Sequence, residues 1–353
     1  MKPANGEPSE AFAPTSEVPA AVHPLRVVAI GGGTGLSTLL RGLRRHVAVP
    51  GQSSETQGLI SDLAAVVTVT DDGGSSGRLR QDFNMLPPGD LRNCMVALSE
   101  EEDLLAQLFN HRFRSGDTLK GHNFGNLFVA ALTEITGDFA FAIELSSKIL
   151  ATRGRIYPAT TSNTALVARL DDGTLVRGET NITASHRRIV ELMLDPPGPA
   201  PLPETLEAIE RADLITVGPG SLYTSLITNL LVEGIPAALA RSRGLRVYVC
   251  NLMTQANESL NLTASEHIAR IYDHTHAPIF DYAIVNTGQF SPETLARYAA
   301  EGAAPIEPDI ERIEAVGVRV IARDFASEES VVRHAADRVA GALLELARTA
   351  SRA

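Results

Sequence analysis

Three glycine-rich segments follow apolar runs in this chain, and each has the residue types of a phosphate-binding loop. The segments are Gly31–Gly35, Asp71–Gly77 and Gly218–Ser221. Glycine lets the backbone approach a ligand closely, and the start of a following helix supplies free N–H groups at the positive end of its dipole. Three such loops predict a site for a ligand with more than one phosphate group, such as a nucleotide.

The first loop contributes Gly32, Gly33, Thr34 and Gly35 as candidate ligand-binding residues. It does not match the dinucleotide fingerprint, because Leu36 stands where the third glycine is needed. It is not a P-loop either, since no Lys-Ser/Thr pair follows, so nucleotide hydrolysis of that type is not expected. A ligand-free turn explains one such loop well, but explains three less well.

Two adjacent carboxylates precede the glycines and serines of the second loop. Asp71 and Asp72 are suited to bind ribose hydroxyls or a hydrated Mg²⁺. Gly73, Gly74 and Ser75 can form an anion-binding nest. An aspartate N-cap is the simpler alternative, but it accounts for only one carboxylate. The Gly-x-Ser-x-Gly spacing from residue 73 also matches the nucleophile elbow of hydrolases, although the sequence places no histidine beside it.

Polar residues at further helix and strand ends extend the candidate site. Arg92 lies one turn into a helix for which Asp90 is the expected N-cap. Asn123 and Asn126 lie in a turn that opens another helix, and Asn251 follows a predicted strand. Their amides can donate to and accept from a base edge or a sugar. The third glycine loop adds three candidates: Gly218, Gly220 and Ser221.

Composition narrows the classes of protein to consider. The 353 residues are 44% hydrophobic and 21% charged, as expected of a soluble globular protein. A net charge of −11 argues against non-specific nucleic-acid binding. Only two cysteines occur, which favours the reducing cytoplasm, and no apolar run approaches the ~20 residues that span a bilayer. Residues 1–24 are rich in Pro, Ala, Glu and Ser and are expected to form a disordered tail.

Predicted strands alternate with predicted helices from residue 25 onwards. Strands are expected at 25–30, 64–70, 214–217, 246–250, 282–285 and 318–322. Helices are expected up to residue 45 and at 90–99, 101–113, 126–136, 139–150, 203–211 and 328–350. Alternating residues around Asp171-Asp172-Gly173 predict a β-hairpin insertion at about 164–180. We therefore expect one α/β domain, 25–350, with a doubly wound, mostly parallel sheet that binds ligands at its C-terminal strand ends.

Taken together, the loops resemble those of the gluconeogenesis factor family, which is related to the 2-phospho-L-lactate transferases. The resemblance covers about residues 26–338 and implies a Rossmann-like domain that binds UDP-sugars, UDP-N-acetylglucosamine among them. It also implies a regulatory, cytoplasmic role in gluconeogenic growth and in cell-shape and envelope morphogenesis. The matching motifs are Gly31–Gly35, Asp71–Gly77, Pro88-Gly89-Asp90-x-Arg92, Gly121-His122-Asn123-x-Gly125-Asn126, Gly218-Pro219-Gly220-Ser221-x-Tyr223-Thr224-Ser225 and Asn251-x-Met253-Thr254-Gln255.

Two positions depart from the family pattern. Arg333-His334 falls where the family shows Arg-His-Asp, and the resemblance implies that Arg333 contacts the nucleotide sugar, but the third residue here is Ala335. Leu262 stands where the family tends to carry a tyrosine. Loss of an aromatic ring removes stacking of about 1 kcal/mol, which leaves the preferred UDP-sugar open.

A nucleotide-sugar-binding regulator is favoured over an enzyme, because no nucleophile or proton-transfer pair stands out. The first and third glycine loops would hold the diphosphate, the asparagines would read uracil or hydroxyls, and Asp71 or Asp72 would hold ribose or sugar. The alternative is a Mg²⁺-dependent phospho-transfer enzyme of the 2-phospho-L-lactate transferase type, with both aspartates on the metal. An aromatic content of 5% disfavours a flavin-like acceptor. An NAD-dependent oxidoreductase ranks last, and protein partners and homo-oligomerisation stay open.

Overall fold

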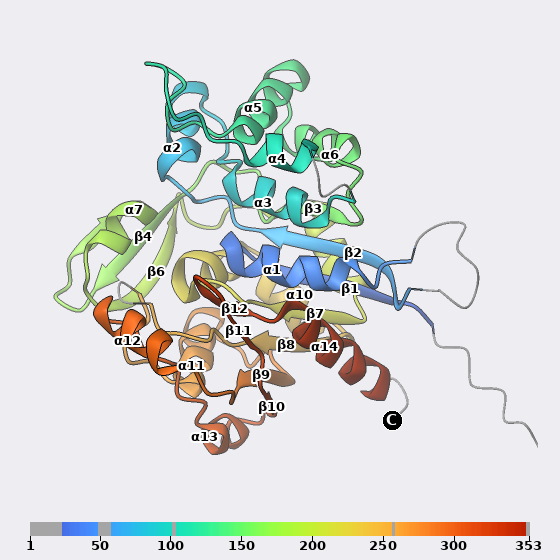
Figure 1. The fold of residues 1–353 in the computed structure, drawn as a ribbon, viewed down its shortest axis with the longest axis vertical. Helices are drawn as coiled ribbons and strands as arrows, with labels where there is room; N and C mark the ends of the chain where they lie inside the picture. Colours follow the sequence, from blue (N-terminus) through green and yellow to red (C-terminus); the bar gives the residue numbers. More distant parts are fainter. Residues whose placement is uncertain (1–22, 49–57, 101–103, 256–257, 351–353) are drawn as a thin grey trace, which may run out of the picture.

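The computed structural model describes residues 23–48, 58–100, 104–255 and 258–350. Its centre is a seven-stranded parallel sheet in the order β10-β9-β8-β7-β1-β2-β3 (Figure 1). The strands are β1 (Leu25–Gly31), β2 (Ile60–Val67), β3 (Arg155–Pro158), β7 (Leu214–Val217), β8 (Leu245–Val249), β9 (Tyr282–Asn286) and β10 (Arg319–Arg323). The chain adds strands to one side of β1 and then to the other, which confirms the predicted doubly wound α/β fold.

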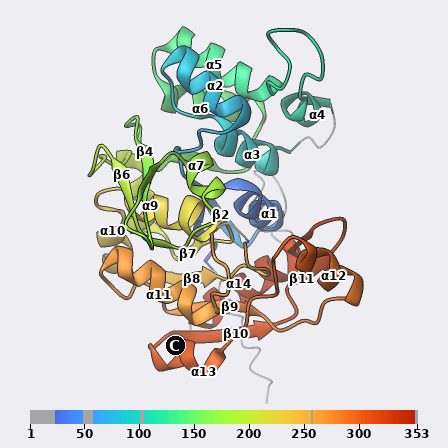
Figure 2. The same cartoon turned by 90° about the vertical axis from the view of Figure 1, so that its left-hand side faces the viewer.

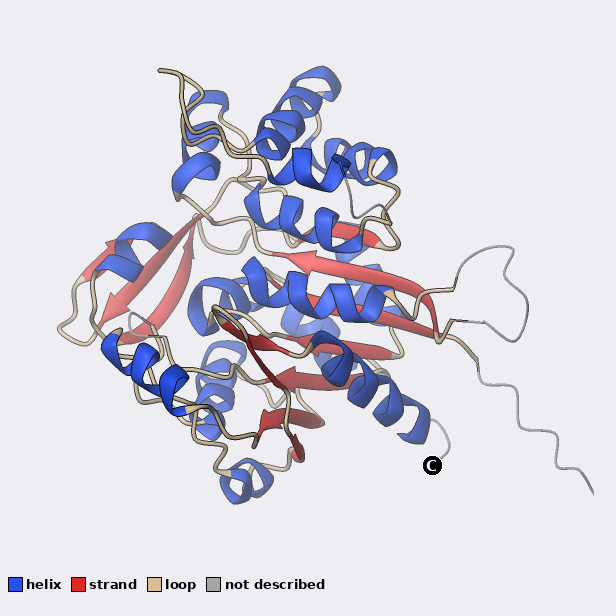
Figure 3. Cartoon of the chain, viewed as in Figure 1, coloured by secondary structure: helices blue, strands red, loops and turns tan. Residues whose placement is uncertain are grey.

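Helices cover both faces of this sheet (Figure 3). They are α1 (Gly33–Arg44), α2 (Gly74–Phe83), α3 (Gly89–Leu98), α4 (Leu104–Asn110), α5 (Phe124–Thr136), α6 (Phe139–Ile149), α7 (Glu179–Ala184), α8 (Pro203–Arg211), the π-helix η2 (Leu222–Ile227), α9 (Thr228–Leu230), α10 (Ile235–Arg241), α11 (Ala264–Thr275), α12 (Pro292–Ala300), α13 (Ile310–Ala315) and α14 (Ala336–Ala350). Among the described residues, no single helix is long and apolar enough to cross a bilayer; only the bent pair 222–230 and 235–241 passes that test, when taken together.

Alternation along β1 divides the core into two layers. Val27 and Ala29 face the layer built with α1, α3 and α14, whereas Val28 and Ile30 face the layer built with α8, α10 and α11. Apolar residues on both faces explain why the parallel strands read as unbroken hydrophobic runs. Helix α1 buries Leu36, Leu39, Leu40 and Leu43, the helical spacing of an amphipathic face. Burial on both sides therefore fixes the direction in which β1 delivers its glycine loop.

The insertion is larger than the predicted hairpin. Strands β4 (Ala165–Leu170), β5 (Leu175–Arg177) and β6 (Ile189–Asp195) form an antiparallel sheet in the order β5-β4-β6, and α7 lies between β5 and β6. The hairpin at 164–180 is thus confirmed in part, but β6 pairs along all of β4 and completes the sheet. Figure 2 shows this sheet beside α7, and Figure 1 shows both at one side of the central strands.

The C-terminal segment differs most from the prediction. The expected helix 328–350 is wrong at its start, because β11 (Ala326–Glu328) and β12 (Val332–His334) form a hairpin and α14 begins only at Ala336. The hairpin is tied to α12 by the Val332 N–H, which donates to the Tyr298 hydroxyl at 2.9 Å. Strand β2 also ends at Val67 rather than at residue 70, and edge strand β3 was not predicted. Residues 1–22 of the predicted tail and 101–103 of a predicted helix lie outside the described residues.

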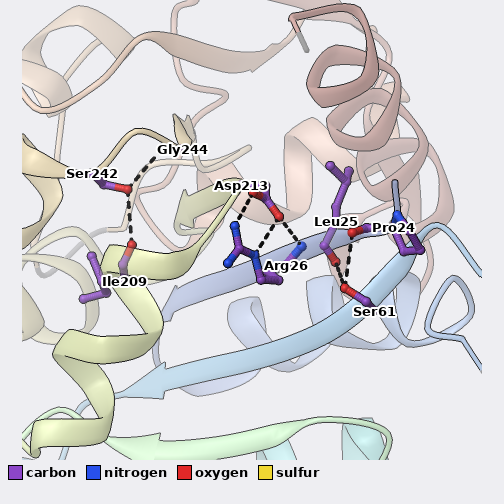
Figure 4. A network of polar contacts seen from close by, with 8 residues as sticks. All are labelled: Pro24, Leu25, Arg26, Ser61, Ile209, Asp213, Ser242 and Gly244. Carbon is purple, nitrogen blue, oxygen red and sulfur yellow. Dashed lines mark hydrogen bonds and ion pairs between the residues drawn. The ribbon is translucent and has the colours of Figure 1, made fainter. Parts of the chain in front are cut away.

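Polar contacts join the strands at the N-terminal edge of the sheet (Figure 4). The Asp213 carboxylate accepts hydrogen bonds from the Arg26 backbone N–H at 2.8 Å and from its Nε and Nη2 at 3.0 and 2.8 Å. The Ser61 hydroxyl donates to the Leu25 carbonyl at 3.3 Å. These contacts hold β1 against both of its neighbours at the edge where the strands begin. The glycine loops lie at the opposite edge.

Candidate functional site

A cleft of about 260 Å³ opens where β1, β7 and β8 end. This is the switch point of the sheet, where ligands of doubly wound proteins bind. The cleft is lined by Gly32, Gly33, Thr34, Gly35, Thr38, Pro219, Gly220, Ser221, Ser225, Asn251, Leu252, Met253, Thr254, Gln255, Tyr298, Val332, Arg333 and His334. Eight predicted site residues belong to this set: Gly32, Gly33, Thr34, Gly35, Gly220, Ser221, Asn251 and Arg333.

The first turn of α1 packs directly against the loop that follows β7. A Cβ atom added to Gly35 would lie 2.5 Å from the Pro219 carbonyl oxygen, which no real Cβ contact allows. Gly32 has no side chain with which to cap α1, so backbone groups of the first turn face the cleft. Gly218 does not line the cleft; its φ of +91° favours glycine, and a Cβ at this position would lie 2.6 Å from the Val249 carbonyl oxygen. The first and third glycine loops can therefore pack together because their glycines have no side chains.

Side chains from the loop after β8 hold the third glycine loop in place. The Asn251 Oδ1 accepts from the Gly220 N–H at 3.1 Å, and its Nδ2 donates to the Gly220 carbonyl at 2.7 Å. The Gln255 Nε2 donates to the Ser221 hydroxyl at 2.9 Å. Asn251 therefore shapes the cleft wall in this structure, and its predicted contact with uracil or a hydroxyl stays a prediction.

Positive charge borders the cleft on the side of the β11–β12 hairpin. Arg333 lines the cleft. Burial, and then the charge of Arg333, lower the pKa of Arg41. The Arg41 guanidinium donates to Thr38 Oγ1 at 3.0 Å. His334 Nε2 contacts the Cys250 carbonyl oxygen at 3.0 Å, and burial lowers the pKa of this imidazole to about 4. His334 is accordingly neutral at physiological pH, and Arg333 supplies the formal positive charge of the lining residues.

The second glycine loop lies beside the cleft rather than in its lining. Asp71 Oδ1 accepts from the Gly73 N–H at 2.9 Å. Asp72 Oδ1 accepts from the backbone N–H and the hydroxyl of Thr180, at 2.9 and 2.6 Å, and so connects this loop to α7. Gly74 has a φ of +50° and begins α2.

Asp90 connects this loop to the cleft. It is not the helix N-cap that the sequence predicted. The N-cap of α3 is Pro88, and Asp90 lies inside the helix. Its carboxylate interacts with the Gly33 backbone N–H, and its Oδ2 lies 2.7 Å from the position of a Cβ on Gly32. Desolvation, and then the charge of Asp71, raise the pKa of Asp90 to about 6.

Four other predicted residues have protein partners and do not line the cleft. Ser75 contacts His122 Nδ1 at 3.2 Å, and Asn123 caps α5 by accepting from the Asn126 N–H at 3.2 Å. Asn126 donates to Ser76 at 3.4 Å, while its buried Oδ1 has no partner within the described part of the chain. Arg92 is directed towards α4, where its Nη1 donates to Asn110 at 2.7 Å. Direct ligand contacts of these residues stay predictions.

Further carboxylates gather near Asp71 and Asp90. Burial raises the pKa of half-buried Glu179 to about 9, and the charges of Asp71, Asp90 and Glu258 add to this effect. Repulsion of this kind is relieved by a cation. Among the described residues, however, no three His, Cys, Asp or Glu side chains are grouped to hold a metal ion by themselves. Mg²⁺ needs only one or two carboxylates when phosphate and water complete its shell, and Asp71 lies close enough to Asp90 for its charge to raise the Asp90 pKa.

Comparison with known proteins agrees with this architecture. A family model described as 2-phospho-L-lactate transferase CofD matches residues 27–326. The chain is 46% identical over 320 residues to the gluconeogenesis factor of Halalkalibacterium halodurans, covering 90% of this chain and 95% of that one. It is 43% identical over 322 residues to the gluconeogenesis factor of Bacillus subtilis, with coverages of 91% and 98%. The chain belongs to the gluconeogenesis factor family.

A solved structure supports the fold of this gluconeogenesis factor family member. The crystal structure of a Bacillus halodurans protein superimposes with a TM-score of 0.85 at 46% identity. The match covers 91% of this chain and 100% of the other. The Rossmann-like α/β interpretation of the sequence is therefore confirmed.

Sequence reasoning missed several residues of this family member's site. Ser225, Thr38 and Tyr298 line the cleft, and Glu179 faces the carboxylates. Ser225 lies inside a recognised motif, so its place in the Gly218–Ser225 segment was a usable signal. Tyr298 comes from α12, whose position relative to the glycine loops no local pattern predicts.

Proposed function

We propose that this chain binds a UDP-sugar in the cleft between the first and third glycine loops, with UDP-N-acetylglucosamine as the leading ligand. The observation that carries the proposal is the direct packing of two glycine loops, Gly35 against Pro219, beside Arg333, the one charged side chain among the described residues that line the cleft. Backbone N–H groups and one guanidinium suit a diphosphate, since both bind its oxygens without a P-loop lysine. Neutral groups on Ser221, Ser225 and Thr254 suit sugar hydroxyls.

We further propose that the bound chain acts in the cytoplasm as a regulatory factor in gluconeogenic growth and in cell-shape and envelope morphogenesis. The name that the relatives carry, gluconeogenesis factor, supports the first of these roles. A UDP-sugar is a precursor of envelope polymers, so its binding would let one protein sense carbon supply and envelope synthesis together.

Titration calorimetry with UDP-N-acetylglucosamine tests the binding proposal. We expect saturable binding that Arg333→Gln weakens by about 10- to 100-fold, because a hydrogen bond to a charged group contributes roughly 1.5–3 kcal/mol. Arg243→Gln is the matched control, since Arg243 is exposed and precedes β8 at the opposite edge of the sheet. Absence of heat at millimolar ligand, or an equal loss in both variants, contradicts the proposal.

The second candidate function is Mg²⁺-dependent transfer of a phosphorus-containing group. The family model's description and the carboxylates beside the cleft favour it. Asp71 and Asp90 would hold the ion, which supplies charge neutralisation at phosphate oxygens when bound. The Asp71 and Asp90 carboxylates accept hydrogen bonds from the N–H groups of Gly73 and Gly33, respectively, and so orient both loops.

Phosphorus NMR of product mixtures separates the two candidates. A transferase converts a nucleotide-activated phospholactate and a deazaflavin acceptor into product only with Mg²⁺, and Asp90→Asn abolishes that conversion. A binding protein leaves the ³¹P spectrum unchanged while still giving calorimetric heat with UDP-N-acetylglucosamine.

A further inference from the structure

Tyr298, which α12 contributes, is the one phenol ring among the described residues that line the cleft. Leu262, where the family tends to carry a tyrosine, packs against the sheet core and does not line the cleft. Tyr298 is half-buried, its hydroxyl accepts from the Val332 N–H at 2.9 Å, and the Arg297 guanidinium carbon lies 5.5 Å from its ring centroid. The ring is therefore held in place before a ligand arrives, which lowers the entropy cost of binding.

The side chains around Tyr298 are apolar, which distinguishes this part of the cleft from the glycine loops. They form a small cluster that is separate from the two core layers of the sheet. Three of its members, Leu252, Met253 and Val332, also line the cleft. Apolar side chains offer no hydrogen bond to a sugar hydroxyl, whereas the face of a nucleobase needs none. This part of the cleft therefore suits a base better than a sugar.

Tyr298 also lies close to the residue that is proposed to bind the diphosphate. Val332, whose N–H donates to the Tyr298 hydroxyl, immediately precedes Arg333 in β12. Only a ribose separates the base of a nucleotide from its phosphates, so the two groups have to be bound by neighbouring residues. Tyr298 and Arg333 meet this requirement, since Val332 is hydrogen-bonded to the first and covalently joined to the second.

We propose that Tyr298 stacks on the base of the bound nucleotide sugar, and so selects nucleotides over sugar phosphates that have no base. The inference rests on the proposed binding of a UDP-sugar in the cleft. The asparagines predicted to read uracil have other places in the structure. Asn123 and Asn126 do not line the cleft, and Asn251 is hydrogen-bonded to the third glycine loop. Stacking on an aromatic ring is a common way for proteins to hold a base.

Titration calorimetry with UDP and with 5,6-dihydro-UDP tests the stacking. Dihydrouracil keeps the oxygen and nitrogen atoms of uracil, but its ring is neither planar nor aromatic. We expect Tyr298→Leu to weaken UDP binding by roughly 5- to 150-fold, the range for loss of a base–aromatic stack. The wild type and Tyr298→Phe should prefer UDP over dihydro-UDP, and Tyr298→Leu should bind the two equally.

The matched control is Tyr282→Leu at the opposite edge of the sheet. Tyr282 is also half-buried, its hydroxyl accepts from Arg319 Nη1 at 2.7 Å, and the Arg319 guanidinium carbon lies 5.1 Å from its ring centroid. It begins β9, away from the cleft. Tyr282→Leu should therefore keep the wild-type preference for UDP.

A fluorescence titration gives an independent readout of the stack. The chain contains no tryptophan, so Tyr298→Trp places a single indole in the cleft. UDP should quench its emission in a saturable way, because the base lies against the indole, and pyrophosphate should not.

Three results would overturn the stacking. The first is an unchanged preference for UDP over dihydro-UDP in Tyr298→Leu; both ligands are measured on the same variant, so a general loosening of the cleft does not imitate this result. The second is weaker binding of UDP-N-acetylglucosamine, but not of UDP, in Tyr298→Leu, which would place the sugar on the ring. The third is equal quenching of Tyr298→Trp by pyrophosphate and UDP. Failure of the wild type to bind UDP-N-acetylglucosamine contradicts the proposed function itself, whereas wild-type binding that Tyr298→Leu leaves unchanged contradicts only the stacking.

Discussion

Replacing Gly35 with alanine tests whether packing of α1 on the third glycine loop builds the cleft. The added Cβ would lie 2.5 Å from the Pro219 oxygen, 2.8 Å from its carbonyl carbon and 3.0 Å from the Gly220 nitrogen. All three are backbone atoms, so no side-chain rotation can relieve the overlap. Either α1 or the loop has to move, and both carry cleft-lining residues.

The expected size of the effect follows from two opposed terms. Overpacking of this kind costs roughly 1–3 kcal/mol, whereas alanine gains up to about 1 kcal/mol over glycine within a helix. Gly341→Ala in α14 is the matched control, because it makes the same chemical change in a helix with nothing within 4 Å of the new Cβ. The difference between the two variants isolates the steric cost, about 1–3 kcal/mol.

Urea denaturation and ligand titration measure the two consequences. We expect Gly341→Ala to unfold at slightly higher urea than the wild type and Gly35→Ala at lower urea. Affinity for UDP-N-acetylglucosamine should fall at least tenfold in Gly35→Ala alone. Equal stability of the two variants, together with equal affinity, would refute the view that this contact shapes the ligand site.

Three other measurements address the carboxylates and a buried histidine. The pKa of Glu179 is about 9 in the folded protein and near 4.5 in the unfolded chain, so the folded state loses stability as pH rises above 4.5. Glu179→Gln should therefore become progressively more stable than the wild type towards pH 8. Glu301→Gln, at an exposed position, should show no such gain. Buried His267 has its pKa lowered to about 4 by desolvation, so stability should fall as pH drops from about 6.5 towards 4, less steeply in His267→Gln. Asp72→Ala removes the two hydrogen bonds from Thr180 and should speed amide hydrogen exchange in α7, with melting near the wild-type temperature.

The layered core was predictable because burial on both faces leaves a continuous signal in the sequence. Val27 to Ile30 is apolar throughout, Ile215 to Val217 is broken only by Thr216, and glycines follow each run, so strand, loop and sheet edge could all be inferred locally. Short elements gave no comparable signal. Strand β3 has four residues and ends in Pro158, and β12 has three, among them Arg333 and His334. Their pairing depends on contacts with distant segments.

The roles of individual side chains were harder to predict than their positions. Asn251 and Asn123 occur at loop positions suited to a ligand, but the structure uses one to hold a glycine loop and the other to cap a helix. Asp90 fitted an N-cap by sequence, yet its carboxylate meets the first glycine loop. An amide or carboxylate near a loop can bind either backbone or ligand, and only the three-dimensional arrangement distinguishes these uses.

The order in which the cleft-lining residues are translated determines when the cleft can be complete. Its walls run from Gly32, in the first strand-to-helix turn, to His334, in the hairpin just before the last helix. A nascent chain can assemble the early strands while Arg333 is still untranslated, because domains begin to fold during synthesis. The cleft therefore cannot be complete before the hairpin has been translated, and a fragment released earlier would lack Arg333, the residue proposed to bind the nucleotide sugar.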